Sequence, residues 1–132
     1  GDLHGLNVLV GSGGVPLLID FGEVRHGPAA TDPVVLELSA LFHPDAPEVL
    51  GDWPTADQAR LWFDLESYTD GCPITAFVRA CRRWASAQGV AAGDHEIAAV
   101  VYSFAMRQLK YEGTNKALAL ALIAAAAERL HN

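Results

Sequence analysis

Three residues near the start of the sequence have side chains that could do chemistry together. Asp2 and Asn7 lie five positions apart, and Asp20 follows thirteen positions after Asn7. Carboxylate and amide oxygens are hard ligands of the kind that Mg²⁺ prefers, and a carboxylate can also orient or deprotonate a hydroxyl group. Phosphoryl transfer uses both properties, because it needs a positioned nucleophile and cations that neutralise the phosphate oxygens.

The spacing of these residues resembles the active site of the aminoglycoside phosphotransferase and choline kinase family, which is related to the protein kinases. The catalytic loop of that family reads H-G-D-x-x-x-x-N, and a metal-binding Asp follows on the next strand. The match is close at residues 1–7 (GDLHGLN) and 20–22 (DFG), and it is general over the remaining helical part. The resemblance implies that Asp2 is the catalytic residue and that Asn7 and Asp20 bind Mg²⁺ and, through it, ATP. His4 and Gly5 are expected to support the shape of the loop.

The same resemblance predicts what the chain represents. The sequence contains no strand-borne Lys, partner Glu or Gly-rich phosphate loop of the kind that grips ATP, and the family's His before Gly1 has no counterpart. We therefore expect residues 1–132 to be a C-terminal lobe, with the N-terminal ATP-binding lobe absent. In the intact protein the resemblance implies ATP- and Mg-dependent transfer to a hydroxyl of an unidentified small molecule. The isolated chain is expected to be inactive and to bind ATP weakly.

Two other functions fit parts of the pattern. A kinase-like module can instead serve as a non-catalytic binding or regulatory domain of a larger bacterial signalling protein, and this alternative stays open. Residues 1–5 (GDLHG) also resemble the first metal motif of metallophosphoesterases. That family needs G-D-x-x-D-R-G and G-N-H blocks downstream, and neither occurs in this sequence. The phosphatase interpretation therefore fails.

The local pattern around these residues predicts a β-hairpin. Residues 7–10 and 15–19 are short apolar runs, and four residues rich in glycine, 11–14, separate them. Such a hairpin would bring Asn7 and Asp20 to the same end. The expected fold class is α+β, with this hairpin carrying the catalytic loop and about five α-helices backing it, as in a kinase-like C-lobe.

Helix signals fill the rest of the sequence. Asp32 before Pro33 is typical of a helix start, and Thr55 with Gln58 forms a capping-box pattern. The clearest amphipathic stripe runs from Pro73 to residue 88. The last predicted helix is apolar on nearly every side and is expected to be central. The five predicted helices cover residues 32–42, 55–68, 73–88, 94–110 and 115–130, with Asp94 and Thr114 as the caps of the last two.

A few further polar residues are weaker candidates. In the resembled family an Asp at the next helix start braces the catalytic loop, and Asp32 either has this role or only caps the helix. The charges of Arg79, Arg82 and Arg83 suit a phosphate, but their position off the apolar stripe favours a solvated helix face. The remaining histidines lack metal-ligand spacing and are expected at the surface or in the core: His26, His43, His95 and His131.

Composition narrows the possible partners and the compartment. The formal net charge is −7, from 9 basic and 16 acidic residues, which argues against an electrostatic grip on nucleic acid or anionic membranes. Cys72 and Cys81 fit no metal or redox spacing, and no secretory signal is visible, so a cytoplasmic protein is expected. The apolar run 117–127 is too short to span a bilayer. The face left by the absent lobe is expected to be apolar and to favour a homodimer.

Overall fold

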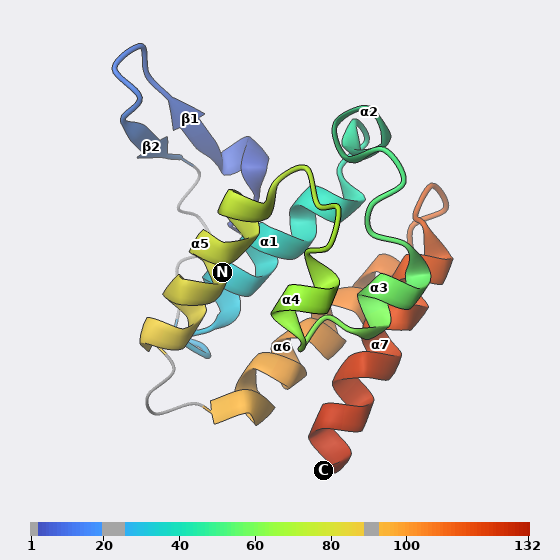
Figure 1. Ribbon diagram of the computed structural model, residues 1–132. Helices are drawn as coiled ribbons and strands as arrows, with labels where there is room; N and C mark the ends of the chain where they lie inside the picture. The colour runs from blue at the N-terminus through green and yellow to red at the C-terminus, as the bar shows by residue number, and fades with distance from the viewer. Residues whose placement is uncertain (1–2, 20–25, 89–92) are drawn as a thin grey trace.

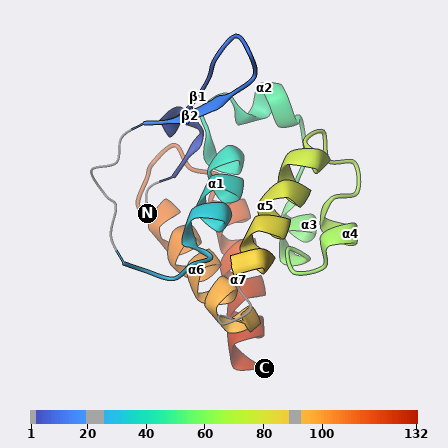
Figure 2. The ribbon, with the colours of Figure 1, turned by 90° about the vertical axis from the view of Figure 1, so that its left-hand side faces the viewer.

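The computed structural model describes residues 3–19, 26–88 and 93–132, and it shows an α+β chain made mostly of helices (Figure 1). The candidate residues Asp2 and Asp20 lie outside these described residues. A two-stranded antiparallel sheet precedes the helices. The hairpin projects from one end of the helical body, and the C-terminus lies at the other end (Figures 1 and 2).

The predicted hairpin is confirmed. Strands β1 (Val8–Val10) and β2 (Pro16–Leu18) pair so that Val8 lies opposite Leu18. In the turn between them, Gly14 has a φ of 76°, a left-handed conformation that glycine adopts without a Cβ clash. The apolar side chains of the hairpin are largely exposed, with Val10, Val15 and Leu17 at 68%, 70% and 60%. The hairpin therefore offers an apolar surface to solvent.

Seven α-helices follow within the described residues, after a single 3-10 turn, η1 (Gly5–Asn7), that precedes the hairpin. The helices are α1 (Thr31–Phe42), α2 (Ala46–Leu50), α3 (Ala56–Arg60), α4 (Leu65–Tyr68), α5 (Thr75–Gln88), α6 (Gly93–Gln108) and α7 (Lys116–His131).

The core forms where the long helices meet. Helix α1 packs against both α5 and α6, while α7 packs against α6 and α3 (Figure 2). The largest fully buried side chains come from these contacts and from the segment that joins α3 to α5. They include Leu38, Trp62, Tyr68, Val101 and Leu122. Helix α1 is thus covered on two sides, which fixes the scaffold behind the 4–8 segment.

The segment 43–68 differs from the expected loop over 43–54 and single helix over 55–68. The capping box is confirmed, since the N–H of Gln58 donates to the Thr55 hydroxyl and the Gln58 side chain accepts from the Thr55 N–H. The helix nevertheless ends at Arg60, and α4 starts anew because the Asp64 carboxylate accepts the N–H of Ser67. Residues 46–50, expected to be loop, form the short helix α2.

Three predicted caps are wrong by one or two positions. Helix α1 begins at Thr31, so Asp32 lies in its first turn and not at its N-cap. Pro33 is compatible with this start, because the first helical N–H groups have no intrahelical partner. Helix α6 begins at Gly93, and Asp94 forms an ion pair with Arg129 instead of capping. The cap of α7 is Asn115, whose side-chain oxygen accepts the N–H of Leu118.

Helix α7 is not the central helix that its composition predicted. One side of it is buried, at Leu118, Leu122 and Ala126 among others, but Leu120 is 55% exposed and Leu130 is 38% exposed. Small alanine side chains make the whole helix look apolar in sequence, although only one side contacts α6 and α3. Alanine is common in helices for its propensity as well as for burial, which explains the error.

Candidate functional site

The segment that carries the resemblance forms a tight turn ahead of the hairpin. His4 precedes η1 in an extended conformation, and its Nδ1 accepts the backbone N–H of Leu6 over 3.2 Å. The backbone N–H of Asn7 donates to the carbonyl of His4 over 2.9 Å. His4 therefore caps the turn, as its expected role in supporting the loop requires.

Asn7 lies where this turn meets the hairpin, and only 7% of it is exposed. Its carbonyl accepts the N–H of Ile19 over 2.9 Å, so residues 7 and 19 pair at the open end of the hairpin. Asp20 is the next residue in the sequence, and both Asp20 and Asp2 lie outside the described residues. The proximity of the Asn7 and Asp20 side chains stays a prediction.

The side chains of His4 and Asn7 are in contact, with His4 Nε2 lying 3.3 Å from Asn7 Nδ2. A neutral imidazole has one donor nitrogen and one acceptor nitrogen. While Nδ1 accepts from Leu6, Nε2 carries the proton and needs the amide oxygen of Asn7. Turning the amide nitrogen toward His4 instead requires Nε2 to accept and ends the bond to Leu6. The orientation of the Asn7 amide and the tautomer of His4 are therefore coupled.

A cavity of about 770 Å³ opens beside this turn. His4, Gly5, Leu6 and Val8 form one part of its wall, and most of the rest comes from α1, α2, α5, α6 and the residues that flank them. Its surface is mostly apolar, and Val35, Ala40, Phe77 and Phe104 are among the lining residues. Arg107 also lines it. Pockets of this size and composition typically hold small organic molecules.

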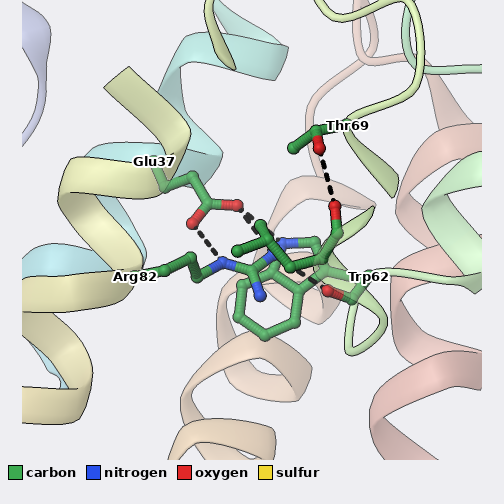
Figure 3. A network of polar contacts seen from close by, with 5 residues as sticks. Glu37, Trp62, Thr69 and Arg82 are labelled. Carbon is green, nitrogen blue, oxygen red and sulfur yellow. Dashed lines mark hydrogen bonds and ion pairs between the residues drawn. The ribbon is translucent and has the colours of Figure 1, made fainter. Parts of the chain in front are cut away.

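A buried ion pair joins two of the helices that line this cavity. Arg82 Nε on α5 lies 2.6 Å from the Glu37 carboxylate on α1, and the Trp62 indole N–H donates to the same carboxylate over 2.9 Å (Figure 3). The Arg82 guanidinium lies 3.4 Å from the centroid of the Trp62 ring. The expectation that Arg82 is solvated is wrong, since its side chain is 15% exposed and that of Glu37 is 1% exposed.

The other two arginines of this helix behave differently. Arg79 forms an ion pair with Glu66, and both side chains are substantially exposed. Arg83 is exposed, as expected for the solvated face of the helix. The sequence pattern placed all three off the apolar stripe, but it could not show that Glu37 approaches only Arg82.

Burial affects the titration of groups around this ion pair. It raises the pKa of the Glu37 carboxyl above its usual value, although Arg82 and the Trp62 N–H act in the opposite direction. Burial also raises the pKa of the Cys81 thiol to about 12, so this thiol stays protonated at neutral pH. Within the described residues, the Tyr68 hydroxyl is buried without a hydrogen-bond partner, and burial raises its pKa well above the usual value.

We expect the stability contribution of Glu37 to fall as pH rises. A carboxyl whose pKa is higher in the folded protein binds its proton more tightly in the folded state. Its contribution to the free energy of unfolding is therefore complete at pH values below the pKa of the unfolded state, and it is lost as the pH rises to the pKa of the folded state. The free energy of unfolding of the wild type, relative to Glu37→Gln, should therefore decrease from about pH 4.3 upward. Urea unfolding across a pH series measures it, and a difference that grows with pH would contradict the direction of the shift.

Sequence reasoning missed two features of the site. Arg107 gave no signal, because its contribution to the cavity depends on the tertiary arrangement that makes α6 and the 4–8 turn line the same cavity. Glu37 did leave a signal: it is the one charged residue in the apolar run 33–42, where a charge that faces the core needs a partner. That signal predicts a buried ion pair, but it does not identify Arg82 as the partner of Glu37.

Comparisons with known proteins identify no relative of this chain: no family model, curated protein or solved structure matches it. Within the part of the chain that the structure describes, no helix has the length and apolar character needed to cross a membrane.

Proposed function

We propose that the protein is a phosphotransferase that moves the γ-phosphoryl group of ATP to a hydroxyl of a small molecule. Asp2 orients the acceptor hydroxyl and takes its proton, while Asn7 and Asp20 hold Mg²⁺. The P–O bond to ADP breaks and a P–O bond to the acceptor oxygen forms, giving ADP and a phosphate monoester. The observation that carries the proposal is the motif spacing combined with the hairpin register, which pairs Asn7 with Ile19, the neighbour of Asp20.

The chemistry of Asn7 suits a magnesium ligand. Its amide supplies a neutral hard oxygen, and Asp20 would add a carboxylate, which together leave room for water and phosphate oxygens. The bound ion would neutralise charge on the phosphates. Asn7 presents its oxygen away from His4 only when its amide nitrogen faces the ring. In that orientation Nε2 of a neutral ring accepts and Nδ1 no longer accepts the N–H of Leu6. His4 is proposed to orient the ligand in this second arrangement, without touching the metal.

The cavity beside the turn supports a small-molecule acceptor. An acceptor hydroxyl must approach the residues that bind the phosphates, and the cavity wall includes His4, Gly5, Leu6 and Val8, the sequence neighbours of Asn7 in the same loop. A binding site formed there by α1, α2, α5 and α6 would differ between proteins through the side chains of those helices. This arrangement separates the catalytic loop from the residues that select the acceptor.

The test of the proposal is transfer by the intact protein. Radiolabelled γ-phosphate from ATP should appear on hydroxyl compounds in a pool of small molecules, and its transfer should require Mg²⁺. An intact protein that binds Mg-ATP but transfers no label to any acceptor or to water would favour a non-catalytic regulatory module.

We expect His4→Ala to weaken Mg²⁺ binding without abolishing turnover. Loss of the ring removes its contact with the Asn7 amide, and loss of a partner that orients a metal ligand typically costs about 10-fold in metal affinity. The measurement is the Mg²⁺ concentration that gives half-maximal transfer, with His95→Ala as the matched control, since His95 is exposed and does not line the cavity. A His4→Ala protein more damaged than Asp20→Asn would contradict the metal assignment.

A further inference from the structure

The cavity beside the 4–8 turn combines an apolar wall with few charged groups among its described lining residues. Aliphatic and aromatic side chains from α1, α2, α5 and α6 line it, including Val35, Ala40, Phe77 and Phe104. Such a wall favours a ligand with an apolar body, because removing apolar surface of the ligand and of the wall from water lowers the free energy of the complex. It offers few partners to a ligand that is polar over its whole surface, whose groups would lose hydrogen bonds to water on entering.

Arg107 gives this cavity a cation. It lies in the last turn of α6, where its charge also suits the helix C-terminus. Among the residues that the structure describes, Arg60, Arg79, Arg82 and Arg129 each form an ion pair with a carboxylate, whereas Arg107 has no such partner. A guanidinium presents a planar fork of donors that matches a carboxylate, sulfonate or phosphate. An anionic ligand group can therefore bind it without displacing a described carboxylate.

Asp45 is the acidic residue that lines the same cavity, and it has its own neighbour. Its carboxylate lies 3.8 Å from Nδ1 of His43, which lines the cavity as well, and its backbone N–H donates to that nitrogen. The Asp45 side chain is 70% exposed and faces strong screening by water. Nδ1 of His43 accepts an N–H and so offers no proton to this carboxylate, which leaves Asp45 an exposed acidic group of the cavity. No carboxylate among the described residues lies within ion-pair distance of Arg107.

We propose that this cavity binds an amphiphilic molecule whose apolar body packs against α1, α5 and α6 and whose anionic group is held by Arg107. Its role as the phosphoryl acceptor, with a hydroxyl directed at the 4–8 turn, rests on the proposed function. The binding of an apolar anion is independent of the proposed function, and it can be measured without nucleotide. The local cation matters because the chain as a whole carries a net charge of −7, which repels anions elsewhere.

The direct test uses 1-anilinonaphthalene-8-sulfonate, a fluorescent dye with an apolar body and one sulfonate. We expect Arg107→Gln to weaken its binding about 10-fold, the effect of losing one charge-assisted hydrogen-bonding group. N-phenyl-1-naphthylamine, which has the same rings without the sulfonate, should bind both proteins equally. Arg83→Gln is the matched control, since Arg83 is an exposed arginine that does not line the cavity.

Filling the cavity provides a second test. Ala40→Phe on α1 should block both dyes, whereas Ala80→Phe on the exposed side of α5 should leave their binding unchanged. Circular dichroism confirms that each variant is folded, and Ala40→Leu replaces Ala40→Phe where the larger side chain prevents folding. The exposed hairpin is checked with Leu17→Ser, which should not affect either dye.

Equal sulfonate affinity of Arg107→Gln and the wild type overturns the proposal. So does loss of the signal in Leu17→Ser, which would place the dye on the hairpin. Dye binding that responds as expected, in an intact protein that transfers no phosphate, supports the cavity assignment and refutes the phosphotransferase. Phosphate transfer that Arg107→Gln does not change supports the phosphotransferase and refutes the role of the Arg107 cavity as the acceptor site.

Discussion

Replacing Arg82 by alanine should lower the free energy of unfolding by about 3–5 kcal/mol, the usual cost of leaving a buried charge without its partner. Glu37 would keep its buried position and its hydrogen bond from Trp62, but it would lose both contacts to the guanidinium, at 2.6 and 3.0 Å. The Trp62 carbonyl would also lose the donor that now lies 2.9 Å away. Urea unfolding at neutral pH measures the change.

Arg79→Ala is the matched control for this prediction. Arg79 lies one turn earlier on α5 and also pairs with a glutamate, but the side chains of Arg79 and Glu66 are 38% and 77% exposed. Exposed ion pairs contribute about 0–1 kcal/mol, so the control should lose little. Equal losses in the two variants would show that helix packing, and not the buried charge, accounts for the effect.

The double variant Arg82→Met with Glu37→Leu distinguishes the contribution of the ion pair to stability from its role in positioning the helices. Replacing both charges removes the desolvation cost as well as the attraction, and such replacements are often neutral or stabilising. We expect it to be more stable than Arg82→Ala. The pair would then serve to fix α1 against α5 and the Trp62 segment, more than to add net stability.

Local patterns in the sequence predicted the parts of the fold that local interactions determine. The hairpin followed from two apolar runs around glycines, and the helix over 75–88 followed from one apolar stripe. The Thr55 and Gln58 cap followed because both partners lie within four residues. The break after Arg60 was missed because Asp64 starts a new helix, a cap inside a segment that looks helical throughout.

Contacts between distant segments account for what the sequence could not predict. Glu37 and Arg82 are 45 positions apart, and nothing in either local pattern identifies the other. The cavity depends in the same way on α6 reaching the 4–8 turn, so Arg107 could not be assigned to it in advance. For the site itself, the sequence predicted that the hairpin brings Asn7 and Asp20 to one end. Asn7 lies at the open end of the hairpin, where its backbone carbonyl accepts the N–H of Ile19, and the position of Asp20 stays a prediction.

Asp2→Asn and Asp20→Asn should both abolish the phosphoryl transfer proposed for the intact protein, for different reasons. Asp2→Asn leaves the proposed metal ligands in place, so Mg-ATP should still bind while kcat falls by roughly 10²–10⁴-fold, the usual contribution of a general base. Asp20→Asn removes a negative ligand, so the ion that bridges the phosphates is misplaced and nucleotide affinity falls together with turnover. Isothermal calorimetry with Mg-ATP, beside the transfer assay, separates the two. Full activity in Asp20→Asn would contradict the metal assignment, and joint loss of nucleotide binding in Asp2→Asn would place Asp2 among the metal ligands instead.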